Sequence, residues 1–334
     1  MSDNYILPNN ISDFIKLRND EKILFTAGPA SLSKENILGL RACFGRDDQD
    51  YSRIENYVMN KLRHISGQEN IVRLQGSASL ALEIISLNFL YGKVLVVSTG
   101  FYSNRLLRLA KDAKLISKEI EEIIVVEYKD LENINGRYDW IISCYTETSK
   151  GFKISLKLLR KKANQLSSKI MLDATASIGL EPDHNLADVI GFSSCKGLFG
   201  LTGAAFIAYK CENKVNVNSF YLNLNSHIEK KMTGPYHSIC SLYETLKKHN
   251  ELKESVKINK KRFCEKFRQY LNIPDVNQPL ICTQTKIKIR SKLDKAVLYN
   301  SRAINEGSII CHLGEVHLAR ESKGEIIKSL EIHN

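Results

Sequence analysis

The sequence predicts an α/β fold: a mostly parallel central sheet with helices on both faces, followed by a small, shortened C-terminal α+β region. Short, almost uninterrupted apolar runs rich in Val and Ile alternate with amphipathic helical patterns through the middle of the chain. Such alternation is typical of strands that are buried on both faces and joined by helices. After about residue 236 longer helical segments dominate, with short strand candidates between them.

The central elements can be assigned from these patterns in chain order. The predicted strands cover residues 94–98, 123–128, 140–145, 170–174, 189–193 and 204–209, and helical patterns between them cover 79–90, 104–113 and 156–166. Between residues 193 and 210 the alternation is broken, because glycine-rich sequence joins one strand directly to the next. We therefore expect the strand at 204–209 to run antiparallel to the strand before it.

The C-terminal part is expected to contain helices and strands in a second, smaller unit. Helical patterns cover residues 238–248, 252–270 and 294–306, and strand candidates lie within 279–289 and 308–313. The first 20 or so residues are expected to form an arm or a helix that packs on another part of the protein. We therefore predict an N-terminal arm (1–21), a large α/β domain (22–236) and a small α+β domain (237–334).

The composition narrows the functional classes. With 43% hydrophobic and 25% charged residues, the chain is neither collagen-like nor intrinsically disordered. No apolar run approaches the roughly 18–20 residues of a membrane-spanning helix, and no signal-peptide pattern is present. The eight cysteines follow no metal-ligand spacing, so we predict no metal site and expect reduced thiols in the cytoplasm. The net charge of +11 is scattered over helix faces, so neither nucleic acid nor a membrane is predicted as a partner.

Polar residues follow the apolar strands at the sheet edge where parallel α/β proteins bind ligands. A short strand runs into Gly76, and the next helix then opens with free N–H groups and two hydroxyls, from Ser77, Ala78 and Ser79. This arrangement favours an anion site, although serines also cap helices without binding a ligand. Asp173 ends another apolar strand, where a carboxylate needs a cation or a strong donor, unless it only caps a loop.

Lys196 and Thr148 follow two further apolar strands. Lys196 is flanked by small residues, so its side chain can be partly buried. Burial favours the neutral form of an amine, which is the form that makes a Schiff base. The alternative is a lysine that extends to the surface. Thr148 could donate to a ligand oxygen or lie in an ordinary turn. A phosphate site, a strand-end Asp173 and a strand-end Lys196 placed 23 residues later match the needs of pyridoxal 5′-phosphate (PLP).

The sequence also resembles the class V aminotransferases of PLP fold type I, and most closely the 2-aminoethylphosphonate–pyruvate transaminases. The resemblance covers about residues 22–250, with a weaker similarity near the C-terminus. Segments similar to the family's motifs occur in the family's order: Phe25-Thr-Ala-Gly-Pro29, Gly45-Arg-Asp-Asp-Gln-Asp-Tyr51, Gln75-Gly-Ser-Ala-Ser79, Thr99-Gly-Phe-Tyr-Ser-Asn-Arg105, Glu147-Thr-Ser-Lys-Gly151, Asp173-Ala-Thr-Ala-Ser-Ile-Gly179, Ser193-Ser-Cys-Lys196 and Met232-Thr-Gly-Pro-Tyr-His-Ser238.

The resemblance implies a PLP-dependent aminotransferase. Its substrates would be a small amine, 2-aminoethylphosphonate or a close analogue, and pyruvate or a similar keto acid. The roles it implies are Lys196 as the catalytic Schiff-base residue, Asp173 at the pyridinium nitrogen, Tyr102 stacked on the ring, Thr148 at the phenolic oxygen, and Ser77, Ala78 and Ser79 at the phosphate. His237 and Ser238 would complete the phosphate site of a neighbouring subunit, which implies a homodimer.

Two departures from the family concern substrate recognition. Ile309 stands where the family has an arginine that grips the substrate's carboxylate or phosphonate, and the small domain is shorter than usual. Arg46 could replace that cation or could be exposed to solvent, and Gly28 in the first motif is the other candidate substrate-binding residue. A PLP-dependent lyase or decarboxylase of the same fold, and a non-catalytic relative, are the alternative interpretations.

Overall fold

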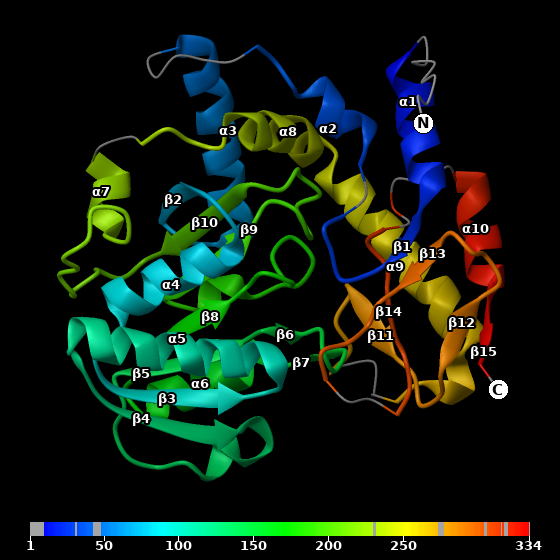
Figure 1. Cartoon of the computed structure of the whole chain (residues 1–334). Coiled ribbons are helices and arrows are strands. Elements are labelled where there is room, and N and C mark those ends of the chain that lie inside the picture. The colour runs from blue at the N-terminus through cyan, green and yellow to red at the C-terminus, as the bar shows by residue number, and fades with distance from the viewer. Residues whose placement is uncertain are drawn as a thin grey trace, which may run out of the picture.

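A seven-stranded sheet forms the centre of the computed structural model (Figure 1). The structure describes residues 10–30, 32–42, 48–229, 232–272, 277–303, 306–314, 316 and 320–333. In order across the sheet, the strands are β2 (Asn70–Gln75), β10 (Ala204–Tyr209), β9 (Val189–Ser193), β8 (Lys169–Asp173), β5 (Trp140–Cys144), β3 (Gly92–Ser98) and β4 (Ile120–Glu127).

One strand of this sheet runs against the others. β10 pairs antiparallel with both β2 and β9, whereas the remaining neighbours, from β9 to β4, pair in parallel. The chain between Ser193 and Ala204 is too short for a crossover to a parallel strand, so β10 returns directly beside β9. The predicted mostly parallel sheet and the predicted antiparallel neighbour are both confirmed.

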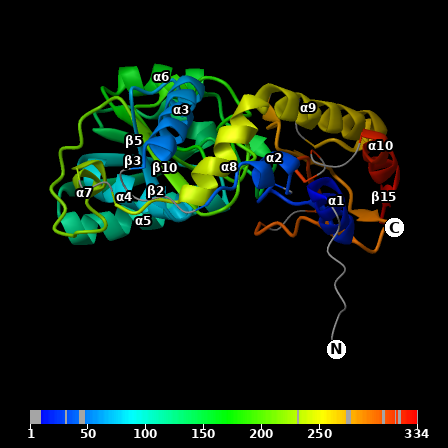
Figure 2. The same ribbon diagram turned by 90° about the horizontal axis from the view of Figure 1, so that it is seen from above.

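Helices cover both faces of the sheet (Figure 2). Leu95 and Val97 of β3 face a core built with α3 (Gln49–Ser66), α6 (Leu156–Gln165) and α8 (Tyr236–Lys247). Val94 and Val96 face the opposite core, built with α4 (Ala78–Phe89), α5 (Phe101–Ser117) and α7 (Leu224–Glu229). The strands are therefore buried on both sides, which explains why their sequences are continuous apolar runs rather than alternating ones.

A second group of elements combines both ends of the described chain. It contains α1 (Ile11–Glu21), α9 (His249–Lys266) and α10 (Arg320–Lys328), with the strand pairs β1 (Ile23–Phe25) and β13 (Ala296–Leu298), β11 (Cys282–Gln284) and β14 (Ile309–Cys311), and β12 (Ile289–Ser291) and β15 (Leu330–Ile332). β1 lies within the predicted large domain but pairs with β13 of the C-terminal part. The predicted domain boundaries stay predictions.

The sequence-based assignment was wrong at residues 294–306, where a helix was expected. The described part of this segment contains β13, which pairs in parallel with β1 so that Ile23 lies opposite Ala296. Ile23 and Phe25 are buried in a cluster with Phe263 of α9. Pairing with a strand from the other end of the chain outweighs the local helical pattern, because strand formation depends on its partners.

The remaining elements are short. They are α2 (Lys34–Leu38), the two-stranded β6 (Thr146–Glu147) and β7 (Phe152–Lys153), and the 3₁₀ turns η1 (Tyr128–Asn133), η2 (His184–Leu186) and η3 (Arg268–Tyr270). The predicted helix over 252–270 corresponds to α9 followed by η3. Among the described residues, no helix has both the length and the apolar composition needed to cross a membrane.

Candidate active site

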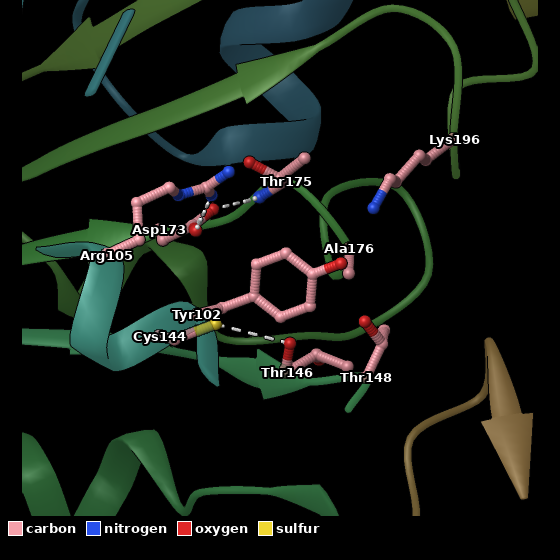
Figure 3. A pocket seen from close by; sticks show the side chains of 9 residues that line it. All are labelled: Tyr102, Arg105, Cys144, Thr146, Thr148, Asp173, Thr175, Ala176 and Lys196. Carbon is pink, nitrogen blue, oxygen red and sulfur yellow. Dashed lines mark hydrogen bonds and ion pairs between the residues drawn. The ribbon is translucent and has the colours of Figure 1, made fainter. Parts of the chain in front are cut away.

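A pocket lies at the carboxyl edge of the parallel strands (Figure 3). It combines residues from α5, from the ends of β5 and β8, and from the turn after β9. Its lining residues are Tyr102, Arg105, Cys144, Thr146, Thr148, Asp173, Thr175, Ala176 and Lys196. Four residues predicted from the sequence to bind the cofactor, namely Tyr102, Thr148, Asp173 and Lys196, are therefore brought together.

Asp173 is a buried carboxylate held from two sides. Its side chain is 2% exposed; the Thr175 N–H donates to Oδ1 at 2.9 Å, and Arg105 Nη2 donates to Oδ2 at 2.7 Å. Burial alone would lower the pKa of Arg105, but the charge and hydrogen bond of Asp173 outweigh burial and raise it. The expectation that this strand-end carboxylate needs a cation or a strong donor is thus met by both, the cation Arg105 and the Thr175 N–H. No role for Arg105 was predicted from the sequence.

Lys196 extends into the pocket rather than to the surface. Its Nζ lies 5.9 Å from the centroid of the Tyr102 ring, and its side chain passes beside Gly28. A Cβ atom on Gly28 would approach Lys196 Cγ to 2.9 Å, and the φ of Gly28 is +123°, so both space and backbone conformation require glycine there. The Ala30 N–H also donates to the Cys195 carbonyl at 2.8 Å, which fixes the first motif beside the lysine turn.

Several polar atoms of the pocket have no hydrogen-bond partner within the described chain. They are the buried hydroxyls of Thr146 and Thr175 and the Nε of Arg105. Buried polar groups are normally partnered, so a cluster of unpartnered ones around a pocket indicates a polar ligand. An aromatic ring, a carboxylate, an amine and hydroxyls around a single pocket fit PLP, which needs stacking, a partner for the ring nitrogen, a Schiff-base lysine and a donor to its phenolic oxygen.

Glu147 fixes the helix that carries Tyr102 and Arg105. This fully buried carboxylate accepts from the N–H groups of Tyr102 at 3.0 Å and Ser103 at 3.3 Å, at the first turn of α5. Its other oxygen accepts from the Ser149 hydroxyl. A carboxylate at a helix N-terminus pairs with free N–H groups and with the positive end of the helix dipole. Glu147 therefore holds α5 at the angle that points its side chains into the pocket.

We expect Glu147→Gln to lower the free energy of unfolding by about 2–3 kcal/mol, because an amide loses the charge-assisted bonds and turns an NH₂ group toward N–H donors. Urea denaturation of the variant and of the wild type measures this difference. Glu119→Gln, which changes an exposed glutamate just beyond α5, is the matched control and should alter stability by less than about 0.5 kcal/mol. Equal stability of the two variants would contradict the role given to Glu147.

The start of α4 offers donors near the pocket. Ser77 is the N-cap residue but its hydroxyl makes no capping bond, so the alternative of plain serine capping does not describe this helix. Ser77 and Ser79 are exposed and Ala78 is buried. The Ser79 hydroxyl accepts from Arg105 Nη1 at 3.3 Å, which connects this helix start to the pocket. Phosphate binding by these residues stays a prediction.

His237 and Ser238 line a hollow that is separate from the pocket lined by Lys196. His237 is exposed, whereas the buried Ser238 donates its hydroxyl to the Thr202 carbonyl at 2.6 Å within its own chain. Gly76, directly before the start of α4, lines the same hollow. The role of His237 and Ser238 in a partner's phosphate site stays a prediction. Arg46 lies outside the described residues.

Ile309, the residue that the resemblance aligns with a substrate-binding arginine, has an apolar side chain. Ile309 is 2% exposed in β14 and belongs to an apolar cluster that includes Ala27 and Ala176. Ala176 also lines the pocket, so the apolar cluster extends to the pocket wall. A substrate anion would need its cation from another part of the chain or from a partner.

Known proteins resemble this chain in sequence and in fold, although no protein-family model matches it. A 2-aminoethylphosphonate–pyruvate transaminase of Pseudomonas putida is 26% identical over 255 residues, covering 69% of each chain. The structure is similar to an alanine–glyoxylate aminotransferase of Nostoc, with a TM-score of 0.77, 15% identity and coverage of 92% of this chain and 94% of that one. It is also similar to a ureidoglycine–glyoxylate aminotransferase of Bacillus subtilis, with a TM-score of 0.75, 15% identity and coverage of 92% and 90%.

These relatives are PLP-dependent aminotransferases, in agreement with the cofactor predicted from the sequence. The structural likeness to the Nostoc and Bacillus subtilis enzymes covers the large α/β part as well as the C-terminal elements, since each comparison covers 92% of this chain. The chain therefore has the fold of the PLP-dependent aminotransferases and resembles their class V in sequence, as its motifs predict.

Proposed function

We propose that this chain is an aminotransferase that moves an amino group from a small amine, 2-aminoethylphosphonate or a close analogue, to pyruvate or a similar keto acid. The observation that carries the proposal is the single pocket shared by Lys196, Asp173, Tyr102 and Thr148. The sequence similarity to 2-aminoethylphosphonate–pyruvate transaminases supports the choice of substrates. The proposal includes a cytoplasmic homodimer with His237 and Ser238 facing the partner's site.

PLP, when bound, supplies an electrophilic aldehyde and a ring that withdraws electrons from the carbon bearing the amine. Lys196 would bind the aldehyde carbon through Nζ and, once displaced by the substrate amine, would carry a proton between two carbons. Tyr102 would stack on the ring, and Thr148 would donate its hydroxyl to the phenolic oxygen. Asp173 would hold the proton on the ring nitrogen, while Ser77, Ala78 and Ser79 would orient the phosphate.

A screen of amine donors tests the proposal. The purified protein with PLP is expected to convert pyruvate to alanine faster with 2-aminoethylphosphonate as the amino donor than with amines of similar length that lack an acidic group. If alanine formed only with another small amine as the donor, the proposed amine would be wrong but the proposed aminotransferase activity would stand. No alanine from any donor, with PLP bound to the protein, would contradict aminotransferase activity.

We expect Arg46→Ala to reduce kcat/KM for the anionic amine about 10- to 150-fold, with little change in PLP affinity. The reason is that Ile309 provides no cation, while an arginine can form paired bonds to phosphonate or carboxylate oxygens. Loss of such a contact costs about 1.5–3 kcal/mol. Arg53→Ala, which removes a side chain that is 77% exposed, is the control and should leave kcat/KM unchanged. Unchanged kinetics of Arg46→Ala on the best substrate would show that the cation lies elsewhere.

A further inference from the structure

Arg105 connects three of the groups that the proposed function assigns to the cofactor. Its Nη2 donates to Asp173 Oδ2 at 2.7 Å, and its Nη1 donates to the Ser79 hydroxyl at 3.3 Å. Its Cζ lies 5.2 Å from the centroid of the Tyr102 ring. Figure 3 shows the guanidinium of Arg105 directed at Asp173 rather than at Lys196. Arg105 therefore lies between the part of the site that would hold the ring and the part that would hold the phosphate.

The lining of the pocket contains more basic than acidic side chains. Among the described residues that line it, Arg105 and Lys196 have basic side chains and Asp173 has an acidic one. The Cys144 thiol beside them stays neutral, because burial and then the nearby Asp173 carboxylate raise its pKa. The buried Glu147 carboxylate accepts hydrogen bonds from the N–H groups in the first turn of α5. Asp173 is thus the carboxylate of the described lining that can pair with a cationic group.

We infer that Arg105 is a positioning residue that shares Asp173 with the ring nitrogen of PLP and limits how strongly that nitrogen holds its proton. The inference rests on the proposed function. A carboxylate offers about four acceptor positions, and Arg105 and the Thr175 N–H use two, so a ring N–H can be added without displacing either. The guanidinium keeps the buried carboxylate paired before the cofactor binds, and its positive charge opposes a second cation at the same carboxylate.

The test compares PLP with 1-deazapyridoxal 5′-phosphate, in which a C–H replaces the ring nitrogen while the aldehyde and phosphate are kept. Binding of each compound to the full-length chain is followed by absorbance for wild type, Arg105→Gln and Arg105→Lys. The matched control is Arg108→Gln on the same helix, because Arg108 is 84% exposed and pairs with Asp112 outside the pocket. Melting temperatures are measured with and without each compound.

We expect Arg105→Gln to raise the preference for PLP over its deaza analogue by roughly tenfold or more, since the positive charge of the guanidinium no longer opposes a protonated ring nitrogen at Asp173. Arg105→Lys retains the charge and should change this preference by less than about threefold, and Arg108→Gln should not change it. Without cofactor, Arg105→Gln is expected to melt below wild type because the buried Asp173 carboxylate loses its cationic partner and keeps only the Thr175 N–H. PLP, but not the deaza analogue, should restore most of the loss.

Equal changes in affinity for the two compounds would show that Arg105 only maintains the shape of the pocket, and would overturn the inference. An Arg105→Gln variant that stays unfolded in the presence of PLP would overturn it too, because the ring N–H should replace the lost partner of Asp173. If wild type binds no PLP, the proposed function fails together with the inference. If wild type binds PLP and Arg105→Gln keeps the wild-type preference, this inference alone fails.

Discussion

Lys196→Ala is expected to abolish covalent attachment of PLP and to reduce turnover by about 10³-fold or more. In the wild type, Lys196 Nζ lies 5.9 Å from the centroid of the Tyr102 ring in a pocket that also contains Asp173, and Gly28 leaves room for its side chain. Borohydride treatment of the wild type with PLP, followed by peptide mapping, should place the cofactor on the peptide that contains Lys196. The same treatment of Lys196→Ala should leave no cofactor on the protein.

Lys150→Ala is a suitable control for this experiment. Lys150 is exposed and lies in the segment that follows Thr148, so its replacement tests whether the loss is specific to the pocket. The control variant should keep both the covalent cofactor and wild-type turnover. Borohydride-fixed cofactor in Lys196→Ala would show that another amine binds PLP and would remove Lys196 from its proposed role.

The central sheet could be predicted because its strands are buried on both faces. β9 and β10 have the predicted bounds, and both are apolar runs between turn-forming residues. The C-terminal strands were harder to predict because they are short and depend on distant partners. β13 forms against β1 from the other end of the chain, and this pairing has no local sequence signal.

The site could be predicted in part for a similar reason. Asp173 and Lys196 stand out as polar residues directly after apolar strands, and parallel strands bring such positions to the same edge. Arg105 lies in a helix 68 residues before Asp173, and Glu147 is 45 residues after Tyr102, so their contacts depend on how α5 is placed on the sheet. The available signal for Arg105 was its position three residues after Tyr102, which puts both side chains on one helix face.

The control for the last prediction comes from the opposite edge of the sheet. Asp188, just before β9, accepts from Arg160 Nη2 at 2.5 Å and from the Ile170 N–H at 2.7 Å, so it is held much as Asp173 is held. Its position at the amino ends of β8 and β9 places it away from the pocket. Asp188→Asn should therefore lower stability without lowering turnover of the folded enzyme.

Asp173→Asn is expected to reduce kcat by about 10²- to 10³-fold while the protein stays folded, because the amide keeps the shape of the side chain but cannot hold a proton on the ring nitrogen by its charge. The Thr175 N–H can still donate to the amide oxygen, and Arg105, which is 28% exposed, can still reach water. Both variants should thus lose stability while staying folded, because each loses one arginine pair, but turnover of the folded enzyme should fall only in Asp173→Asn. Steady-state kinetics with the best amine, together with urea denaturation of both variants, measures this contrast. Near-wild-type turnover in folded Asp173→Asn would mean that the carboxylate serves only to pair Arg105, and that ring protonation does not depend on it.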